Sequence, residues 1–221
     1  MDTMTPRSAR VMALLAVLAA LVVPLRPADA SSCGLQKKSD GVSHRSQYFT
    51  RASTWVYGDS ITYQVWPELE QRFPDAAIDA YWGRRTRDVL DRIRQDVPRH
   101  APKTVVVATG TNDRGDPHQF ADDVQRIRKW LPASTRLIWV LVYVDTPPTW
   151  QDVDTKVLAV PRVEVVDWVT PNLQARGNGE RSPLLYDGKH LNCRGASVWL
   201  DLVAKAIDPI TGLRLTLPVP A

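Results

Sequence analysis

Two distant places in the chain carry residue types that act together in acyl transfer. Ser60 follows Gly58 and Asp59, and His190 lies three residues after Asp187. A serine hydroxyl is a weak nucleophile unless a base accepts its proton, and a carboxylate can orient that base. Residues three apart on a turn can face each other, so Asp187 can hold the imidazole Nδ1 proton and leave Nε2 free for Ser60. This pattern predicts a serine nucleophile with a histidine base.

The hydrophobic pattern predicts the elements that must position these residues. Segments that alternate with the strands carry one apolar stripe at helical spacing, and a last amphipathic helix is predicted from about 196 to 207. Alternating strands and helices with short connections predict an α/β fold, a three-layer α/β/α sandwich with a five-stranded parallel sheet. The predicted strands are short and rich in Val, Ile and aromatic residues: 54–58, 77–81, 104–109, 137–144 and 163–167.

Polar turns follow these strands at the edge where ligands bind. In an open α/β sheet the ligand site lies beyond the carboxyl ends of the strands. Any one polar turn is weak evidence, because such turns are common on protein surfaces. Four turns are predicted to converge on this edge, and the last of them precedes the final helix: 58–61, 82–84, 110–113 and 187–190.

Together and in this order, the four turns resemble the SGNH hydrolase superfamily, also called GDSL esterases. The sequence blocks of that superfamily, Gly-Asp-Ser, Gly, Gly-x-Asn-Asp and Asp-x-x-His, match at 58–60, 83, 110–113 and 187–190. The resemblance covers about residues 54–207 and implies a flavodoxin-like sandwich with ester hydrolysis at a serine. The sequence has no Gly-x-Ser-x-Gly motif, which argues against the α/β-hydrolase fold.

The resemblance also implies a role for each motif residue. A serine at the start of a helix offers its own N–H and the positive end of the helix dipole to an oxyanion. Asp59 and Asp113 are expected to bond to loop backbone rather than to react. The catalytic residues implied are Ser60, Asp187 and His190, and the oxyanion donors are Ser60, Gly83 and Asn112.

Three residues near the predicted site are candidates for substrate binding: Trp82, Arg84 and Trp150. Packing in the core is the alternative for both tryptophans. Around these positions the chain is similar to the extracytoplasmic SGNH domains of bacterial cell-wall polysaccharide O-acetyltransferases and their esterase relatives. It departs from the transferases in having Asp113 after Asn112, which is more usual in esterases, and in lacking their multi-pass membrane part.

Composition limits the remaining classes. The 221 residues are 44% hydrophobic and 24% charged, which is typical of a globular protein and excludes a disordered chain or a collagen-like fibre. The net charge of +4 comes without a long basic run, so no nucleic acid partner is expected. His44, His100 and His118 are expected at the surface, and no pair has metal-ligand spacing. We therefore expect a monomer that needs no metal or other cofactor.

The first thirty residues are typical of a secretory signal. Arg7 and Arg10 precede an apolar run over 11–23, and residues 28–30 supply the small-x-small cleavage pattern. A retained membrane anchor is disfavoured, because such a run spans roughly 20 Å of a hydrocarbon core near 30 Å. The expected organisation is a signal over 1–30, a polar lead over 31–52, the hydrolase domain over 53–208 and an unassigned tail over 209–221. The protein is expected to be extracytoplasmic, with no stable membrane insertion after cleavage.

The chain has two cysteines, Cys33 and Cys193. In an oxidising compartment such a pair can persist as a disulfide, which is our prediction. Two buried thiols are one alternative. Lipidation of Cys33 is another, and it is disfavoured because no large aliphatic residue lies three positions before it.

The leading hypothesis is a secreted serine esterase that removes acetyl or short acyl groups from a carbohydrate or another envelope-associated ester. An O-acyltransferase acting on envelope polysaccharide is the second hypothesis. A wall-binding module without catalysis is the third, and the complete set of motif residues argues against it.

Overall fold

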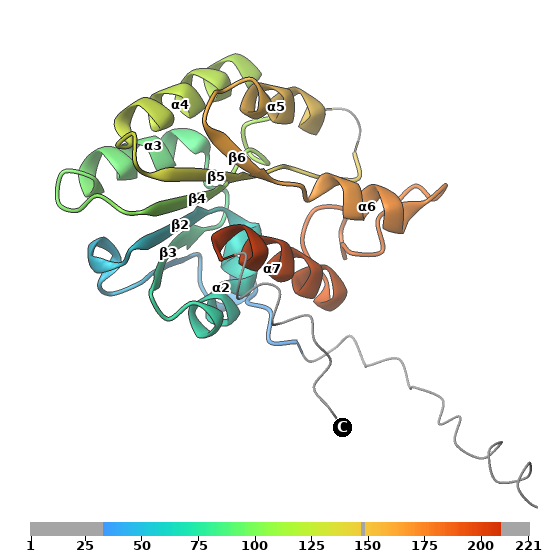
Figure 1. Cartoon of the computed structure of the whole chain (residues 1–221). Helices are drawn as coiled ribbons and strands as arrows, with labels where there is room; N and C mark the ends of the chain where they lie inside the picture. The colour runs from blue at the N-terminus through green and yellow to red at the C-terminus, as the bar shows by residue number, and fades with distance from the viewer. Residues whose placement is uncertain (1–32, 147–148, 209–221) are drawn as a thin grey trace, which may run out of the picture. The chain divides into compact units, whose positions relative to one another are not determined.

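The computed structural model describes residues 33–146 and 149–208 (Figure 1). A six-stranded sheet with the strand order β1-β3-β2-β4-β5-β6 forms the centre of this part. Its strands are β1 (Ser43–Arg45), β2 (Thr54–Gly58), β3 (Ala76–Tyr81), β4 (Thr104–Ala108), β5 (Arg136–Val140) and β6 (Val163–Val166). The α-helices are α2 (Ser60–Arg72), α3 (Thr86–Asp96), α4 (Pro117–Trp130), α5 (Thr149–Leu158), α6 (Val169–Arg176) and α7 (Cys193–Ile207).

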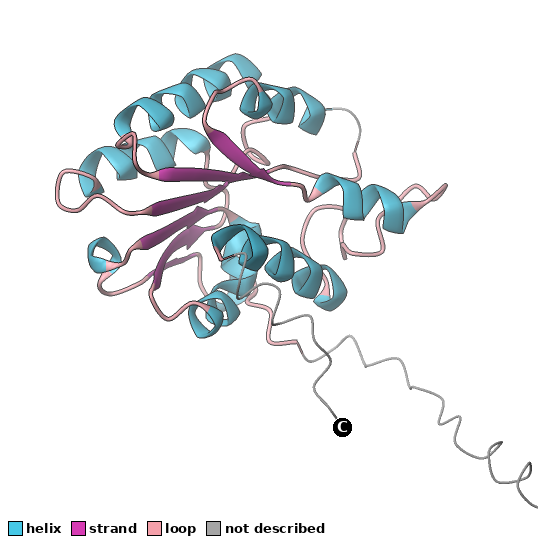
Figure 2. Cartoon of the chain, in the orientation of Figure 1, coloured by secondary structure: helices cyan, strands magenta, loops and turns pink. Residues whose placement is uncertain are grey.

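The strand side chains divide between two hydrophobic cores, one on each face of the sheet. In β4, Val106 packs with residues of α2 and α7, whereas Val105 and Val107 pack with residues of α3, α4 and α5. Successive strand residues point to opposite faces, so a continuous apolar strand such as β4 feeds both cores. Figure 2 shows the strands as one layer with helices on either side. The predicted three-layer α/β/α fold is confirmed.

The sheet has one strand more than predicted. Strand β1 lies within the segment expected to be a polar lead, and it pairs antiparallel with β3, with His44 opposite Ala80. The other five strands pair in parallel. The hydrophobic pattern missed β1 because an edge strand of three polar residues, Ser-His-Arg, carries no hydrophobic alternation.

The predicted strand over 137–144 is also shorter in the structure. Strand β5 ends at Val140, and residues 141–144 stay buried without continuing the ladder. The Leu141 N–H donates to Val166 O (3.0 Å), and the Val142 N–H donates to Asp154 Oδ1 (2.8 Å). A buried apolar run therefore indicated burial correctly but overstated the length of the strand.

A disulfide joins Cys33 to Cys193, the first residue of α7, as predicted. It connects the start of the described chain to the helix that follows the His190 turn. The expected signal over 1–30 and the tail over 209–221 lie outside the described residues. Among the residues that the structure describes, no helix is long and apolar enough to cross a membrane.

Candidate active site

Ser60 is the first residue of α2 and follows a tight turn from β2. The Asp59 side chain caps this helix by accepting a hydrogen bond from the Ile61 N–H (2.9 Å). Gly58 leaves room for the first turn of α2, because a Cβ at Gly58 would lie 1.9 Å from Thr62 Oγ1. The Ser60 side chain is thereby fixed at the carboxyl edge of the sheet, where the helix N-terminus favours negative charge.

The turn 187–190 brings a histidine and a carboxylate to this serine. Ser60 Oγ lies 3.0 Å from His190 Nε2, and His190 Nδ1 lies 2.7 Å from Asp187 Oδ2. The other oxygen of Asp187 accepts from the backbone N–H groups of Lys189 (3.0 Å) and His190 (2.7 Å). The structure thus assembles the three residues in the order of a nucleophile, a base and a group that orients the base.

Asp187 stays ionised in this arrangement. Partial burial alone would raise the pKa of the Asp187 carboxyl, but the hydrogen bonds from the His190 side chain and backbone outweigh it, so the pKa is lowered. A carboxylate at this position accepts the Nδ1 proton of a neutral His190 and leaves Nε2 able to take a proton from Ser60.

The two other motif turns meet beside this arrangement. Asn112 donates from Nδ2 to the backbone carbonyl of Arg84 (3.0 Å), directly after Gly83. Gly83 has φ +80°, which a glycine adopts without strain, and no atom lies within 4 Å of where a Cβ would be. Asp113 accepts from both the N–H and the hydroxyl of Thr86, the first residue of α3. Asp59 and Asp113 therefore both hold turns in place, as expected of them.

The three candidate substrate-binding residues differ in their surroundings. Trp82 is half-buried, and its ring centroid lies 4.8 Å from that of His190. Trp150 packs against Tyr143 (centroids 5.6 Å apart) and contacts both hydrophobic cores, which is the packing alternative.

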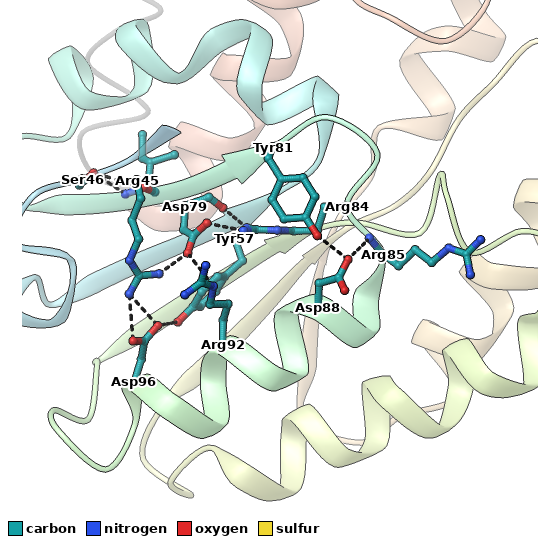
Figure 3. Close-up of polar contacts among 11 residues, drawn as sticks. Arg45, Ser46, Tyr57, Asp79, Tyr81, Arg84, Arg85, Asp88, Arg92 and Asp96 are labelled. Atoms are coloured by element: carbon teal, nitrogen blue, oxygen red, sulfur yellow. Dashed lines mark hydrogen bonds and ion pairs between the residues drawn. The ribbon is translucent and has the colours of Figure 1, made fainter. Parts of the chain in front are cut away.

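The structure does not support a substrate-binding side chain at Arg84. Only 1% of this residue is exposed, and its guanidinium turns back to bond the carbonyl and the carboxylate of Asp79 (Figure 3). Its place directly after the predicted oxyanion glycine made Arg84 a candidate for substrate binding, and the sequence did not reveal that Asp79, five residues earlier, would be buried beside it.

Two residues near the site were missed by the sequence reasoning. The ring of Tyr186 stacks on His190 with centroids 5.8 Å apart, and Tyr186 is 60% exposed. Its position directly before Asp187 was a usable signal. Gln64, one turn after Ser60 on α2, binds the backbone of Leu191, and nothing in the sequence pattern indicated that contact.

Open space adjoins the site. A surface cleft of about 570 Å³ is bordered by Asp187, Gly188, Lys189 and Arg181, among other residues. Clefts of this size accommodate small ligands or part of a polymer. In the described residues, no cluster of three His, Cys, Asp or Glu side chains could hold a metal ion. His44 pairs with Glu70 (2.9 Å) and stacks on Trp66.

Comparison with known proteins agrees with this geometry, although no known family profile matches the chain. The chain is 26% identical over 160 residues to the peptidoglycan O-acetyltransferase OatA of Listeria monocytogenes serovar 1/2a. The match takes in 70% of this chain and 24% of OatA, so the chain spans about a quarter of the length of that relative.

Two solved structures are similar in fold. One is the C-terminal catalytic domain of the Streptococcus pneumoniae peptidoglycan O-acetyltransferase OatA, with a methylsulfonyl adduct (TM-score 0.57, 23% identity, 77% of this chain and 96% of that chain). The other is a GDSL-like lipase of Bacteroides thetaiotaomicron (TM-score 0.57, 17% identity, 73% of this chain and 89% of that chain). The motif turns, the sheet that carries them and these likenesses together show that the chain has the SGNH, or GDSL, hydrolase fold.

Proposed function

We propose that the protein is a serine esterase that hydrolyses carboxylic esters through an acyl-Ser60 intermediate. The observation that carries this proposal is the hydrogen-bonded series from Ser60 Oγ to His190 Nε2 (3.0 Å) and from His190 Nδ1 to Asp187 (2.7 Å). Distances of this size allow direct proton transfer between the nucleophile and its base.

The first half of the reaction forms the acyl-enzyme. Ser60 Oγ attacks the ester carbonyl carbon while His190 Nε2 takes the hydroxyl proton, and the carbonyl oxygen becomes an oxyanion. The donors for this oxyanion are the Ser60 and Gly83 backbone N–H groups and the Asn112 amide. The carbon–oxygen bond to the alcohol then breaks, and His190 returns its proton to the departing alkoxide.

The second half consumes water. His190 Nε2 takes a proton from a water molecule, whose oxygen attacks the acyl carbonyl, and the tetrahedral species collapses to a carboxylic acid. Ser60 regains its proton from His190. Asp187 remains ionised throughout and stabilises the imidazolium, in keeping with its lowered pKa.

The substrate we propose is a short acyl ester, such as an acetyl ester, on a carbohydrate of the cell envelope. Similarity to the two peptidoglycan O-acetyltransferases supports the acetyl group and the glycan. Trp82 and Tyr186 offer aromatic surface next to His190, and the adjoining cleft offers room. The Cys33–Cys193 disulfide supports an oxidising, extracytoplasmic location.

An O-acetyltransferase is the second candidate, and the similarity to OatA is the observation that favours it. Both reactions share the acyl-enzyme, so the triad geometry does not separate them. The acceptor decides the outcome: a bound sugar hydroxyl must reach the acyl carbonyl faster than water does. Asp113, which is more usual in esterases, favours water.

An ester panel tests the proposal. The purified protein is given aryl esters from acetyl to palmitoyl and acetylated glycans, with free acetate and glycan-bound acetyl measured together. We expect fastest turnover of acetyl or short acyl esters, with most acetyl released as acetate even when glycan oligomers are present at about millimolar concentration, near typical KM values. If most of the acetyl appears on sugar hydroxyls while free acetate stays low, the transferase replaces the esterase.

A further inference from the structure

Arg84 is a buried cation that pairs with the carboxylate of Asp79. Its guanidinium donates to the Asp79 backbone carbonyl and to Asp79 Oδ1, and it lies 4.3 Å above the Tyr81 ring (Figure 3). Both groups on Asp79 belong to β3, whereas the Arg84 backbone lies beyond the end of that strand. The side chain therefore ties the turn that follows Tyr81 back to the strand that precedes it.

The other side of Asp79 is anchored in the same way. Arg45 in β1 donates to Asp79 Oδ2 and, with two bonds of 2.9 Å, to Asp96 at the end of α3. Asp96 also accepts from the Tyr57 hydroxyl (2.9 Å). Asp79 and Asp96 are 3% and 2% exposed. Because a planar guanidinium fork fixes the orientation of its acceptors, this cluster holds three strands and α3 in one geometry.

The backbone of Arg84 lies at the candidate active site, although its side chain does not. The Arg84 carbonyl accepts one hydrogen from Asn112 Nδ2 (3.0 Å). A side-chain amide carries two hydrogens on its nitrogen, so this bond fixes the amide plane and leaves the second hydrogen free to donate elsewhere. The N–H of Gly83 belongs to the residue directly before. The position of one backbone segment thus sets both donors.

We propose that Arg84 is a positioning residue, whose buried ion pair with Asp79 aligns the Gly83 N–H and the Asn112 amide for the oxyanion. This inference rests on the proposed function, because it assigns those two donors to the ester reaction. Arg84 touches no substrate and acts through the turn. Its loss is expected to slow the chemical step and to leave ground-state binding of a small ester nearly unchanged.

Two variants of Arg84 test the proposal in the full-length chain. Arg84→Met removes both bonds, and Arg84→Lys keeps the charge but not the planar fork. With a small aryl acetate we expect Arg84→Met to lower kcat by about 100-fold, as loss or misplacement of one oxyanion donor does, with KM within about twofold. Arg84→Lys should lower kcat by at least about tenfold. If Arg84→Met does not fold, the kcat of Arg84→Lys tests whether Arg84 positions the turn. A kcat for the folded variant within about threefold of wild type would overturn the proposal.

The double variant Arg84→Met/Asn112→Ala distinguishes a positioning role of Arg84 from a general loss of stability. If Arg84 acts through this turn, the loss of kcat in Arg84→Met/Asn112→Ala should be much smaller than the product of the two single losses, because both changes remove the same stabilisation. Independent, multiplying losses would contradict the proposal. Tyr57→Phe is the matched control: it removes the bond to Asp96 in the same buried cluster but leaves both Arg84 bonds to Asp79 in place, so its melting temperature should fall while kcat holds.

A readout without substrate distinguishes failure of this inference from failure of the proposed function. In amide NMR spectra, Arg84→Met or Arg84→Lys should shift and broaden the signals of Gly83 N–H and the Asn112 side chain, and Tyr57→Phe should leave them in place. Unchanged signals in the Arg84 variants would overturn the inference whatever the enzyme does. Altered signals in a protein that cleaves no ester would instead contradict the proposed function alone.

Discussion

Gln64 and Leu191 are joined by two hydrogen bonds between the helix that carries the nucleophile and the turn that carries the base. The Leu191 N–H donates to Gln64 Oε1 (3.0 Å), and Gln64 Nε2 donates to Leu191 O (3.2 Å). Gln64 is buried and lies four residues after Ser60 on α2, while Leu191 directly follows His190. The pair therefore fixes the separation between Ser60 Oγ and His190 Nε2.

Replacement of Gln64 by leucine should slow ester cleavage. The variant removes both bonds and leaves the Leu191 backbone groups without these partners, so the His190 turn loses its link to α2. We expect kcat to fall by about 10- to 100-fold, since small misplacements of reacting groups cost that much, with KM changed less. Steady-state kinetics on an aryl acetate measures both quantities.

Gln71→Leu is the control for this prediction. Gln71 is exposed near the end of the same helix, eleven residues after the nucleophile. It should match wild type in kcat. Equal rates for Gln64→Leu and wild type would show that the backbone contact does not align the base.

The pH dependence of stability should carry the signature of Asp59. Burial raises the pKa of the Asp59 carboxyl to about 7, although its bond from the Ile61 N–H opposes the shift. Between the unfolded pKa near 4 and the folded value, the unfolded chain has lost a proton that the folded chain still binds. This group therefore lowers stability progressively as pH rises through that range, and the full loss is present above pH 7.

Asp59→Asn should flatten that part of the profile. Asparagine keeps the side-chain oxygen that caps α2 but does not titrate. Melting temperatures from pH 4 to 8 should show the variant gaining on wild type as pH rises, with the gap constant above pH 7. Asp154, whose pKa burial also raises to about 7, supplies the matched comparison in Asp154→Asn. Parallel profiles for Asp59→Asn and wild type would refute the assignment.

Loss of the disulfide should destabilise the fold. The bridge spans 160 residues and ends three residues after His190. A closed loop of this length constrains the unfolded chain, so Cys33→Ser/Cys193→Ser should lower the melting temperature by roughly 5–15 °C. Native protein treated with an alkylating agent before reduction should take up no label. Two labelled thiols at that stage would mean that the bridge does not form.

Trp82 and Tyr186 should matter more for a polymer than for a small ester. Both rings contact His190 and extend the surface beside it. Tyr186→Ala and Trp82→Ala should therefore raise KM for an acetylated polysaccharide by about tenfold, the equivalent of one lost stacking contact, and change KM for an aryl acetate little. Equal damage to both substrates would make these rings structural supports of His190.

The sequence predicted the sheet and the triad because each has a local signature. Val105 to Val107 form a continuous apolar run, as expected of a strand covered on both faces, and Ser60, Asp187 and His190 lie in short motifs at strand or turn ends. Strand β1 escaped prediction because its three residues are polar and carry no hydrophobic alternation, so only the pairing with β3 reveals it.

Contacts between distant segments account for the other differences. The sequence made Arg84 a candidate for substrate binding, but in the fold its side chain binds Asp79; Gln64, which the sequence did not single out, binds the backbone of Leu191. The motifs identify the reacting groups. The residues that align those groups do so through tertiary contacts, which a local sequence pattern does not reveal.

The most direct test of the account is the fate of the Ser60 hydroxyl during turnover. The protein is mixed with an excess of aryl acetate, quenched in acid within the first turnovers, and analysed by intact mass and peptide mapping, with Ser60→Ala in parallel. We expect an added acetyl group on the peptide that contains Ser60, and a loss of turnover of about 10⁴-fold or more in Ser60→Ala, since triad residues act as a unit. Turnover retained in Ser60→Ala, or an acetyl group that maps to another residue, would contradict it.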